Sequence, residues 1–173
     1  MQIKATKELG WNAIEARNVG GENIHDISDD SFGDVCELLE ASNIKINCFG
    51  STIANWGRQV DDPFEVTITQ VERAIKRMQI LGTKLIRIMS YAQSPGENQN
   101  KDERFRRLRE ISNRFIAAGI TPVHENCMNY GGMSSHHSLE LIENVPGLKL
   151  IFDSNQDFQS HARLAVTGLL EGL

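Results

Sequence analysis

The chain has 173 residues and a formal net charge of −5, from 18 lysines and arginines against 23 aspartates and glutamates. That length is enough for one domain with its own hydrophobic core. No basic block stands apart from acidic neighbours, so the composition argues against a nucleic-acid-binding protein. No apolar run approaches the ~20 residues of a membrane-spanning helix, and the N-terminus lacks the apolar core of a signal peptide, so we expect no membrane contact.

Three cysteines, Cys36, Cys48 and Cys127, are odd in number, widely spaced and surrounded by apolar residues. This usage is typical of reduced thiols in a cytoplasmic protein and not of a disulfide framework or a zinc knuckle. We therefore expect a cytoplasmic protein. The arginines at positions 104–109 lie between Glu103 and Glu110 on a predicted helix, which indicates a solvated face.

The first half of the chain alternates predicted helices with short strands. Apolar residues recur at helical spacing over 2–9, 32–41 and 63–81, and runs rich in β-formers cover 12–17 and 44–49. Glycines or an asparagine follow each helix, as is common just past a helix end. A serine at position 28 or 31 can cap the second helix, and an Asp-Pro pair at 62–63 predicts the start of the third.

The second half repeats the same pattern. Helices are predicted over 102–118 and 135–145, and strands over 84–89, 121–127 and 148–153. Each strand is apolar at its start and polar at its end. Strands that alternate with helices of this length predict a parallel sheet, either a barrel or an open doubly wound sheet. No glycine-rich phosphate-binding motif follows any strand, which favours the barrel.

Ligands bind at the carboxyl ends of the strands in both of these folds, so the polar strand ends are the candidate site residues. Glu125 and Asp153 end neighbouring predicted strands and could hold a hard divalent ion such as Mg²⁺ or Mn²⁺. Arg87 suits an anionic substrate group. Because His124 and Glu125 alternate along one strand they face opposite ways, and we expect Glu125 to face the barrel mouth.

Structural interpretations compete with these functional ones. The polar end of the 121–127 strand could be ordinary solvated loop, since loops collect polar groups. Glu15, which ends the first strand, could contact substrate or could join Arg17 or Arg87 in a structural ion network. Cys127 has no histidine clearly positioned to activate it as a nucleophile.

The strand ends resemble those of a known family. The resemblance rests on four strings, GWNAIEAR, LIRIMSY, TPVHENCMNYGG and LKLIFDSN, which are similar to the xylose isomerase-like TIM-barrel superfamily, in particular the sugar phosphate isomerases/epimerases. It covers residues 1–155 and implies a (β/α)₈ barrel with a divalent metal (Mn²⁺, Mg²⁺, Co²⁺ or Zn²⁺) and a sugar substrate. It further implies that Glu125 is a metal ligand and an acid/base, that Asp153 is a second ligand, and that Arg87, His124 and Asn126 line the substrate pocket.

The chain also departs from that family. A barrel of this type needs about 250 residues, and no strands here match the two that would supply the family's remaining histidine and glutamate ligands. We therefore expect a partial barrel over residues 1–155 with about five strands, and a divergent, helical tail over 156–173. Open sheet edges and a half-exposed interior would favour self-association.

Three functions are compatible with this pattern. The first is a metal-assisted sugar or sugar-phosphate isomerase/epimerase that moves a proton next to a carbonyl, and that lacks activity if the missing strands are essential. The second is a non-catalytic remnant of the fold that forms oligomers. The third, an AP-endonuclease-like DNA repair protein, is disfavoured by the acidic net charge and by the scarcity of histidines at strand ends.

Overall fold

The computed structural model describes residues 2–153, so the tail expected at 156–173 lies outside the described residues. Its centre is a parallel sheet in the strand order β1-β4-β5-β6-β7. Those strands are β1 (Ala13–Ala16), β4 (Lys45–Gly50), β5 (Leu85–Ile88), β6 (Thr121–Glu125) and β7 (Lys149–Ile151). They follow one another in chain order without a reversal, which is the winding of a barrel wall and not of a doubly wound sheet. The predicted partial barrel of five parallel strands is confirmed.

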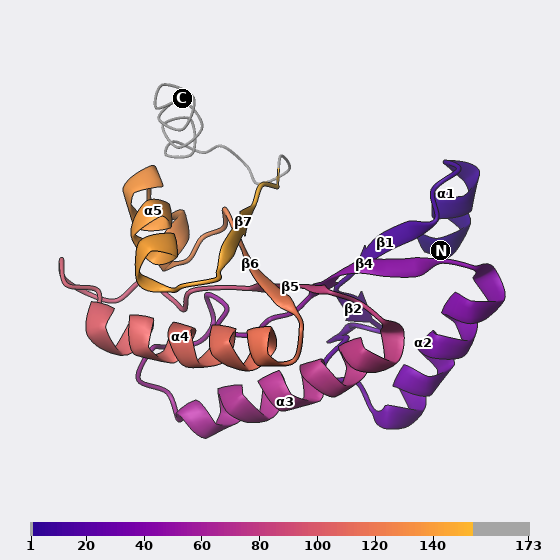
Figure 1. The fold of residues 1–173 in the computed structure, drawn as a ribbon, viewed down its shortest axis with the longest axis horizontal. Coiled ribbons are helices and arrows are strands. Elements are labelled where there is room, and N and C mark those ends of the chain that lie inside the picture. Colours follow the sequence, from indigo (N-terminus) through magenta and orange to yellow (C-terminus); the bar gives the residue numbers. More distant parts are fainter. Residues whose placement is uncertain (1, 154–173) are drawn as a thin grey trace.

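One helix precedes β1, and each of the others lies in sequence between two consecutive strands of the sheet. They are α1 (Gln2–Glu8), α2 (Asp29–Ser42), α3 (Phe64–Leu81), α4 (Lys101–Ala117) and α5 (Ser135–Asn144), with a 3₁₀ turn η1 (Tyr130–Gly132). Figure 1 shows α3 and α4 side by side under one face of the sheet, whereas α1 lies at the β1 end and α5 beside β7. Among the helices of residues 2–153, none combines the length and the apolar composition of a membrane-spanning segment.

Most helix ends follow from local signals in the sequence. The Ser28 hydroxyl accepts a hydrogen bond from the Ser31 N–H and caps α2, and Gly82 ends α3 in the left-handed conformation with φ of 68°. The start of α3 differs from the expectation. Pro63 occupies the capping position without a side-chain bond, and the Asp62 carboxylate instead accepts from the Gln59 N–H at 2.9 Å.

A small hairpin was not predicted from the sequence. Its strands, β2 (Asn18–Val19) and β3 (Glu22–Asn23), pair antiparallel. Gly20 and Gly21 form its two-residue turn with φ of 61° and 95°, a conformation that favours glycine at both positions. The Asn23 side-chain amide donates to the Gly50 carbonyl at 3.0 Å. The hairpin is thereby tied to the end of β4.

The hydrophobic core fills the space between the sheet and the helices. Its fully buried members include Val71, Met78, Ile86, Ile88, Leu108, Ile111 and Phe115. One expectation about this layer was wrong. The basic run on α4 is not wholly solvated, because Arg104 is fully buried and donates to the Gln99 carbonyl at 2.9 Å. Its guanidinium also lies 4.7 Å from the centre of the Tyr130 ring, so it serves packing.

Candidate active site

Three of the predicted site residues meet at the carboxyl end of the sheet. The register pairs Glu15 with Cys48 across β1 and β4, and Arg87 with Val123 across β5 and β6. Parallel partners point to the same face, so Glu15, Arg87 and Glu125 share the face that the core helices do not cover. Arg87 Nη1 forms an ion pair with Glu125 Oε2 and lies 3.4 Å from Glu15 Oε1.

The three side chains differ in their access to water. Arg87 and Glu125 are 7% and 3% exposed, whereas Glu15 is 39% exposed. A buried charge is costly unless it is paired, so the Arg87–Glu125 contact neutralises two groups that could not stand alone. Arg87 Nε is also buried and has no hydrogen-bond partner among the described residues. The guanidinium therefore keeps a donor available for another group.

Two thiols lie in the electrostatic field of the same groups. Burial, and then the Glu15 carboxylate, raise the pKa of Cys48 to about 11. Burial and then Glu125 also raise the pKa of Cys127. Both thiols are therefore protonated at neutral pH and are poor nucleophiles.

Asp153 is held beside the end of β6 by Asn126. The Asn126 Oδ1 accepts from the Asp153 N–H at 2.7 Å, and its Nδ2 donates to the Asp153 carbonyl at 3.2 Å. Glu125 pairs with Ile151 in the register, and Asp153 lies two residues beyond Ile151. Asn126 uses both ends of its amide for this clamp, and its substrate-binding role stays a prediction.

The donor set fits a hard divalent ion in chemical type. Mg²⁺ is commonly held by one or two carboxylates while water and substrate oxygens complete its shell. Glu125 and Asp153 are such a pair. Within residues 2–153, however, no group of three or more histidines, cysteines, aspartates or glutamates could hold a metal. The Arg87 guanidinium on Glu125 is the cation with which a metal would compete.

His124 lies on the opposite face of β6 from Glu125, as alternation requires. Its ring is 1% exposed, and its Nε2 lies 3.0 Å from Ser90 Oγ and 2.9 Å from Asn129 Oδ1. Burial lowers the pKa of His124 to about 4, so the ring is neutral at pH 7. The structure does not bring it to Arg87 and Glu125. Its substrate-binding role stays a prediction, and its contacts are those of a structural residue.

Two close-packed glycines were missed, Gly50 at the site and Gly131 beside His124. A Cβ on Gly50 would lie 2.8 Å from Glu15 Oε1, and a Cβ on Gly131 would lie 2.5 Å from His124 Cε1. Gly131 therefore permits close packing and is not merely part of a flexible turn. The signal available in the sequence was a glycine directly after an apolar strand, at Gly50, but its neighbour across the sheet could not be deduced from it.

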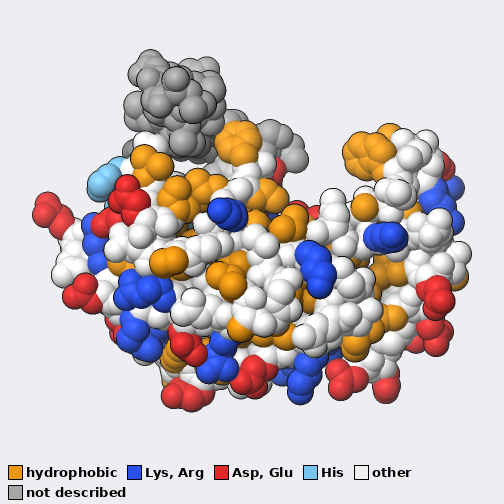
Figure 2. Space-filling model, in the orientation of Figure 1, with side chains coloured by type: hydrophobic (Ala, Val, Ile, Leu, Met, Phe, Trp, Pro, Cys, Tyr) orange, Lys and Arg blue, Asp and Glu red, His pale blue; other side chains and the backbone are white. Residues whose placement is uncertain are grey.

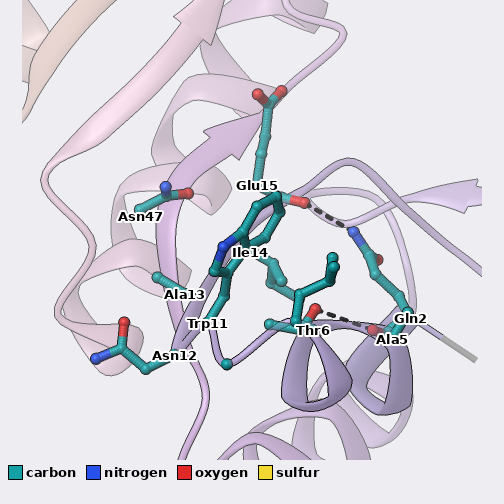
Figure 3. A pocket seen from close by; sticks show the side chains of 11 residues that line it. Gln2, Ala5, Thr6, Trp11, Asn12, Ala13, Ile14, Glu15 and Asn47 are labelled. Atoms are coloured by element: carbon teal, nitrogen blue, oxygen red, sulfur yellow. Dashed lines mark hydrogen bonds between the residues drawn. The ribbon is translucent and has the colours of Figure 1, made fainter.

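A separate cavity of about 780 Å³ lies between α1 and β1 and is lined by residues that include Leu9, Trp11, Ile14 and Asn47. Figure 3 shows Trp11, Ile14 and Asn47 around the strand and the Gln2 amide directed at the Glu15 carbonyl. Of the three grouped charged residues, Glu15 alone lines this cavity, and Arg87 and Glu125 do not. The cavity thus marks the exposed edge of β1 and not the centre of the charged cluster.

Comparisons with known proteins agree with this fold. The family model described as xylose isomerase-like TIM barrel matches residues 3–162. No curated protein sequence matches the chain.

Three solved structures show the same fold. A xylose isomerase-like TIM barrel protein from Mycobacterium smegmatis, in complex with magnesium, has a TM-score of 0.69 and 15% identity over 86% of this chain and 54% of its own. A probable 3-DHS dehydratase from Bacillus anthracis has a TM-score of 0.70 and 20% identity over 88% and 56%. A D-psicose 3-epimerase with D-tagatose from Clostridium cellulolyticum H10 has a TM-score of 0.67 and 14% identity over 94% and 61%. The chain therefore spans little more than half the length of these proteins.

Proposed function

Because this chain belongs to the xylose isomerase-like TIM barrel family, we propose that it acts on sugars or sugar phosphates as an isomerase or epimerase. The reaction would move a proton at a carbon next to a carbonyl. The observation that supports this proposal is the meeting of Glu15, Arg87 and Glu125 at the carboxyl ends of three parallel strands, beside Asp153. This end of the sheet is where barrels of this kind bind their ligands.

In the proposed reaction, Glu125 takes the proton from the substrate carbon and returns it to the same or a neighbouring carbon. Glu125 suits this role because its side chain is only 3% exposed, so that substrate would displace the remaining water. Arg87 would orient a phosphate, carboxylate or hydroxyl oxygen of the substrate through its buried Nε. Glu15, at the exposed rim, would contact a sugar hydroxyl.

Glu125 and Asp153 would hold a divalent ion, which when bound would polarise the substrate carbonyl and make the adjacent proton more acidic. The ion would therefore bind on the face that Glu15 and Arg87 share. Asn126 would fix Asp153 for this task, because its amide grips the Asp153 backbone on both sides.

Calorimetric titration with Mn²⁺ tests the proposed metal site. We expect saturable binding to the wild-type chain and a loss of at least about tenfold in affinity in Glu125→Ala and in Asp153→Ala, since each removes one of two charged ligands. Glu37→Gln, which removes one exposed charge on α2, is the matched control. Epimerisation of a panel of ketoses and their phosphates should fall in the same two variants. Binding that is unchanged by both substitutions would contradict the metal site.

A second candidate, a non-catalytic protein that associates with copies of itself, is favoured by the exposed sheet edge. Among the described residues β1 pairs only with β4, and Leu9 and Trp11 beside it are 60% and 64% exposed. Figure 2 shows further hydrophobic side chains on the side of the sheet away from α3 and α4. An open strand edge flanked by apolar surface is a common site of association.

Size-exclusion chromatography with light scattering tests this second candidate. We expect a dimer or larger species for the wild-type chain and a shift towards monomer for Trp11→Ser, because that change removes the largest apolar group at the edge. Ile80→Ser is the matched control, since Ile80 is 69% exposed on α3, away from β1. A monomer at several hundred micromolar wild-type protein would rule out association.

A further inference from the structure

One nitrogen atom serves two carboxylates in this site. Arg87 Nη1 forms the ion pair with Glu125 and also lies 3.4 Å from Glu15 Oε1. The three groups carry a net charge of −1 when all are ionised. Glu125 is 3% exposed and Glu15 is 39% exposed. Arg87 is therefore shared between a buried carboxylate and one that water reaches.

The two carboxylates differ in what it costs to leave them without the guanidinium. An unpaired charge in a protein interior is strongly destabilising, whereas an exposed one remains solvated. In this arrangement Glu125 requires a cation and Glu15 does not. If a ligand binds Glu125 and displaces Arg87, the guanidinium needs another negatively charged partner, because Arg87 itself is only 7% exposed.

Glu15 is already placed to provide that counter-charge. It lies within ion-pair distance of the nitrogen that Glu125 uses, so the guanidinium needs only a small rotation to exchange partners. Arg87 Nε makes no hydrogen bond within the described residues, so that nitrogen does not hold the group in its present position. Glu15 can stay in range of Arg87 because Gly50 has no side chain. A Cβ at Gly50 would lie 2.8 Å from Glu15 Oε1 and 3.1 Å from the Ala16 carbonyl.

We propose that Glu15 is a positioning residue that receives Arg87 when a divalent cation takes Glu125, and that Gly50 provides the space for this exchange. The inference rests on the proposed function, because it concerns what makes Glu125 available. It assigns to Glu15 a role that acts through Arg87 and not through contact with the cation.

A double-mutant cycle on Mn²⁺ affinity tests the exchange. Glu15→Gln should weaken Mn²⁺ binding about tenfold, because Arg87 then stays on Glu125. Arg87→Met should strengthen binding, because no guanidinium competes for Glu125. In the Arg87→Met background, Glu15→Gln should change the affinity by less than about twofold, as the distant control Glu37→Gln does in wild type. If Glu15 acted as a simple attractive charge, it would weaken binding equally in both backgrounds, and the exchange would be refuted.

Gly50→Ala gives a second measurement that does not depend on a stable Arg87→Met protein. This change displaces the Glu15 carboxylate from Arg87 but keeps its charge. The exchange predicts that Mn²⁺ binding weakens to the level of Glu15→Gln, with no further loss in the double variant. Wild-type affinity in Gly50→Ala would overturn the inference.

The experiment separates this inference from the proposed function. If Mn²⁺ binding depends on Asp153 but the Glu15 and Arg87 effects are additive, the exchange is wrong and the metal site stands. If wild type, Glu15→Gln and Arg87→Met all fail to bind Mn²⁺, the metal part of the proposed function is wrong, and the exchange falls with it.

Discussion

Replacing Arg87 by methionine is expected to lower the free energy of unfolding by about 3 to 5 kcal/mol, the usual cost of removing one partner of a buried ion pair. Glu125 is 3% exposed and would lose its cation. Glu125→Gln should cost clearly less, because Arg87 would retain Glu15 at 3.4 Å. The two halves of one ion pair are thus expected to differ in their effect on stability.

Urea unfolding at pH 7, followed by far-UV circular dichroism, measures this difference. Arg106→Met is the matched control, because Arg106 also pairs with a glutamate, Glu103, but is 53% exposed. An exposed pair contributes at most about 1 kcal/mol. Equal losses in Arg87→Met and Arg106→Met would show that the Arg87–Glu125 pair is solvated. Equal losses in Arg87→Met and Glu125→Gln would show that Glu15 does not support Arg87.

The second large effect concerns acid pH. Burial is the main cause that lowers the pKa of both His25 and His124 from 6.5 to about 4. As the pH falls, these two histidines bind protons in the unfolded chain before they do so in the folded protein. Their contribution to the free energy of unfolding is therefore complete above pH 6.5 and is lost as the pH falls towards 4. At 1.36 kcal/mol per pKa unit, each histidine contributes about 3 kcal/mol of pH-dependent stability.

Thermal unfolding between pH 7 and pH 4.5 tests this expectation. The wild-type free energy of unfolding should fall steadily across that range, and His25→Gln or His124→Gln should each remove about half of the slope. His136→Gln on the exposed start of α5 is the control. Glu103 does not obscure this measurement, because its pKa in the folded protein is about 2, below the pH range of the experiment. Hydrogen bonds from Arg106 are the main cause that lowers it. A flat profile in wild type would show that water reaches both rings.

Much of the fold could be predicted because its signals are local. Apolar spacing within each segment identified α3 and α4, and residues such as Ser28 and Gly82 marked helix ends through bonds within a few residues. The strand order also followed, because short right-handed crossovers place consecutive parallel strands side by side. The β2–β3 hairpin was missed because its strands have only two residues each, too few for a period to appear.

The candidate site could be predicted only as a set of residue types. The sequence by itself determined that Glu15, Arg87, Glu125 and Asp153 end parallel strands, since each follows an apolar run that must be buried. Which carboxylate Arg87 contacts was left open, and the tertiary structure decided it. The β1–β4 register shifts between Ile14 and Glu15, so that Glu15 pairs with Cys48, and a shift of one residue changes the face on which every later side chain lies. The periodicity of apolar residues can be seen within each segment of the sequence. Strand register and ion-pair partners depend instead on how several strands pack together, so they cannot be deduced from any single segment.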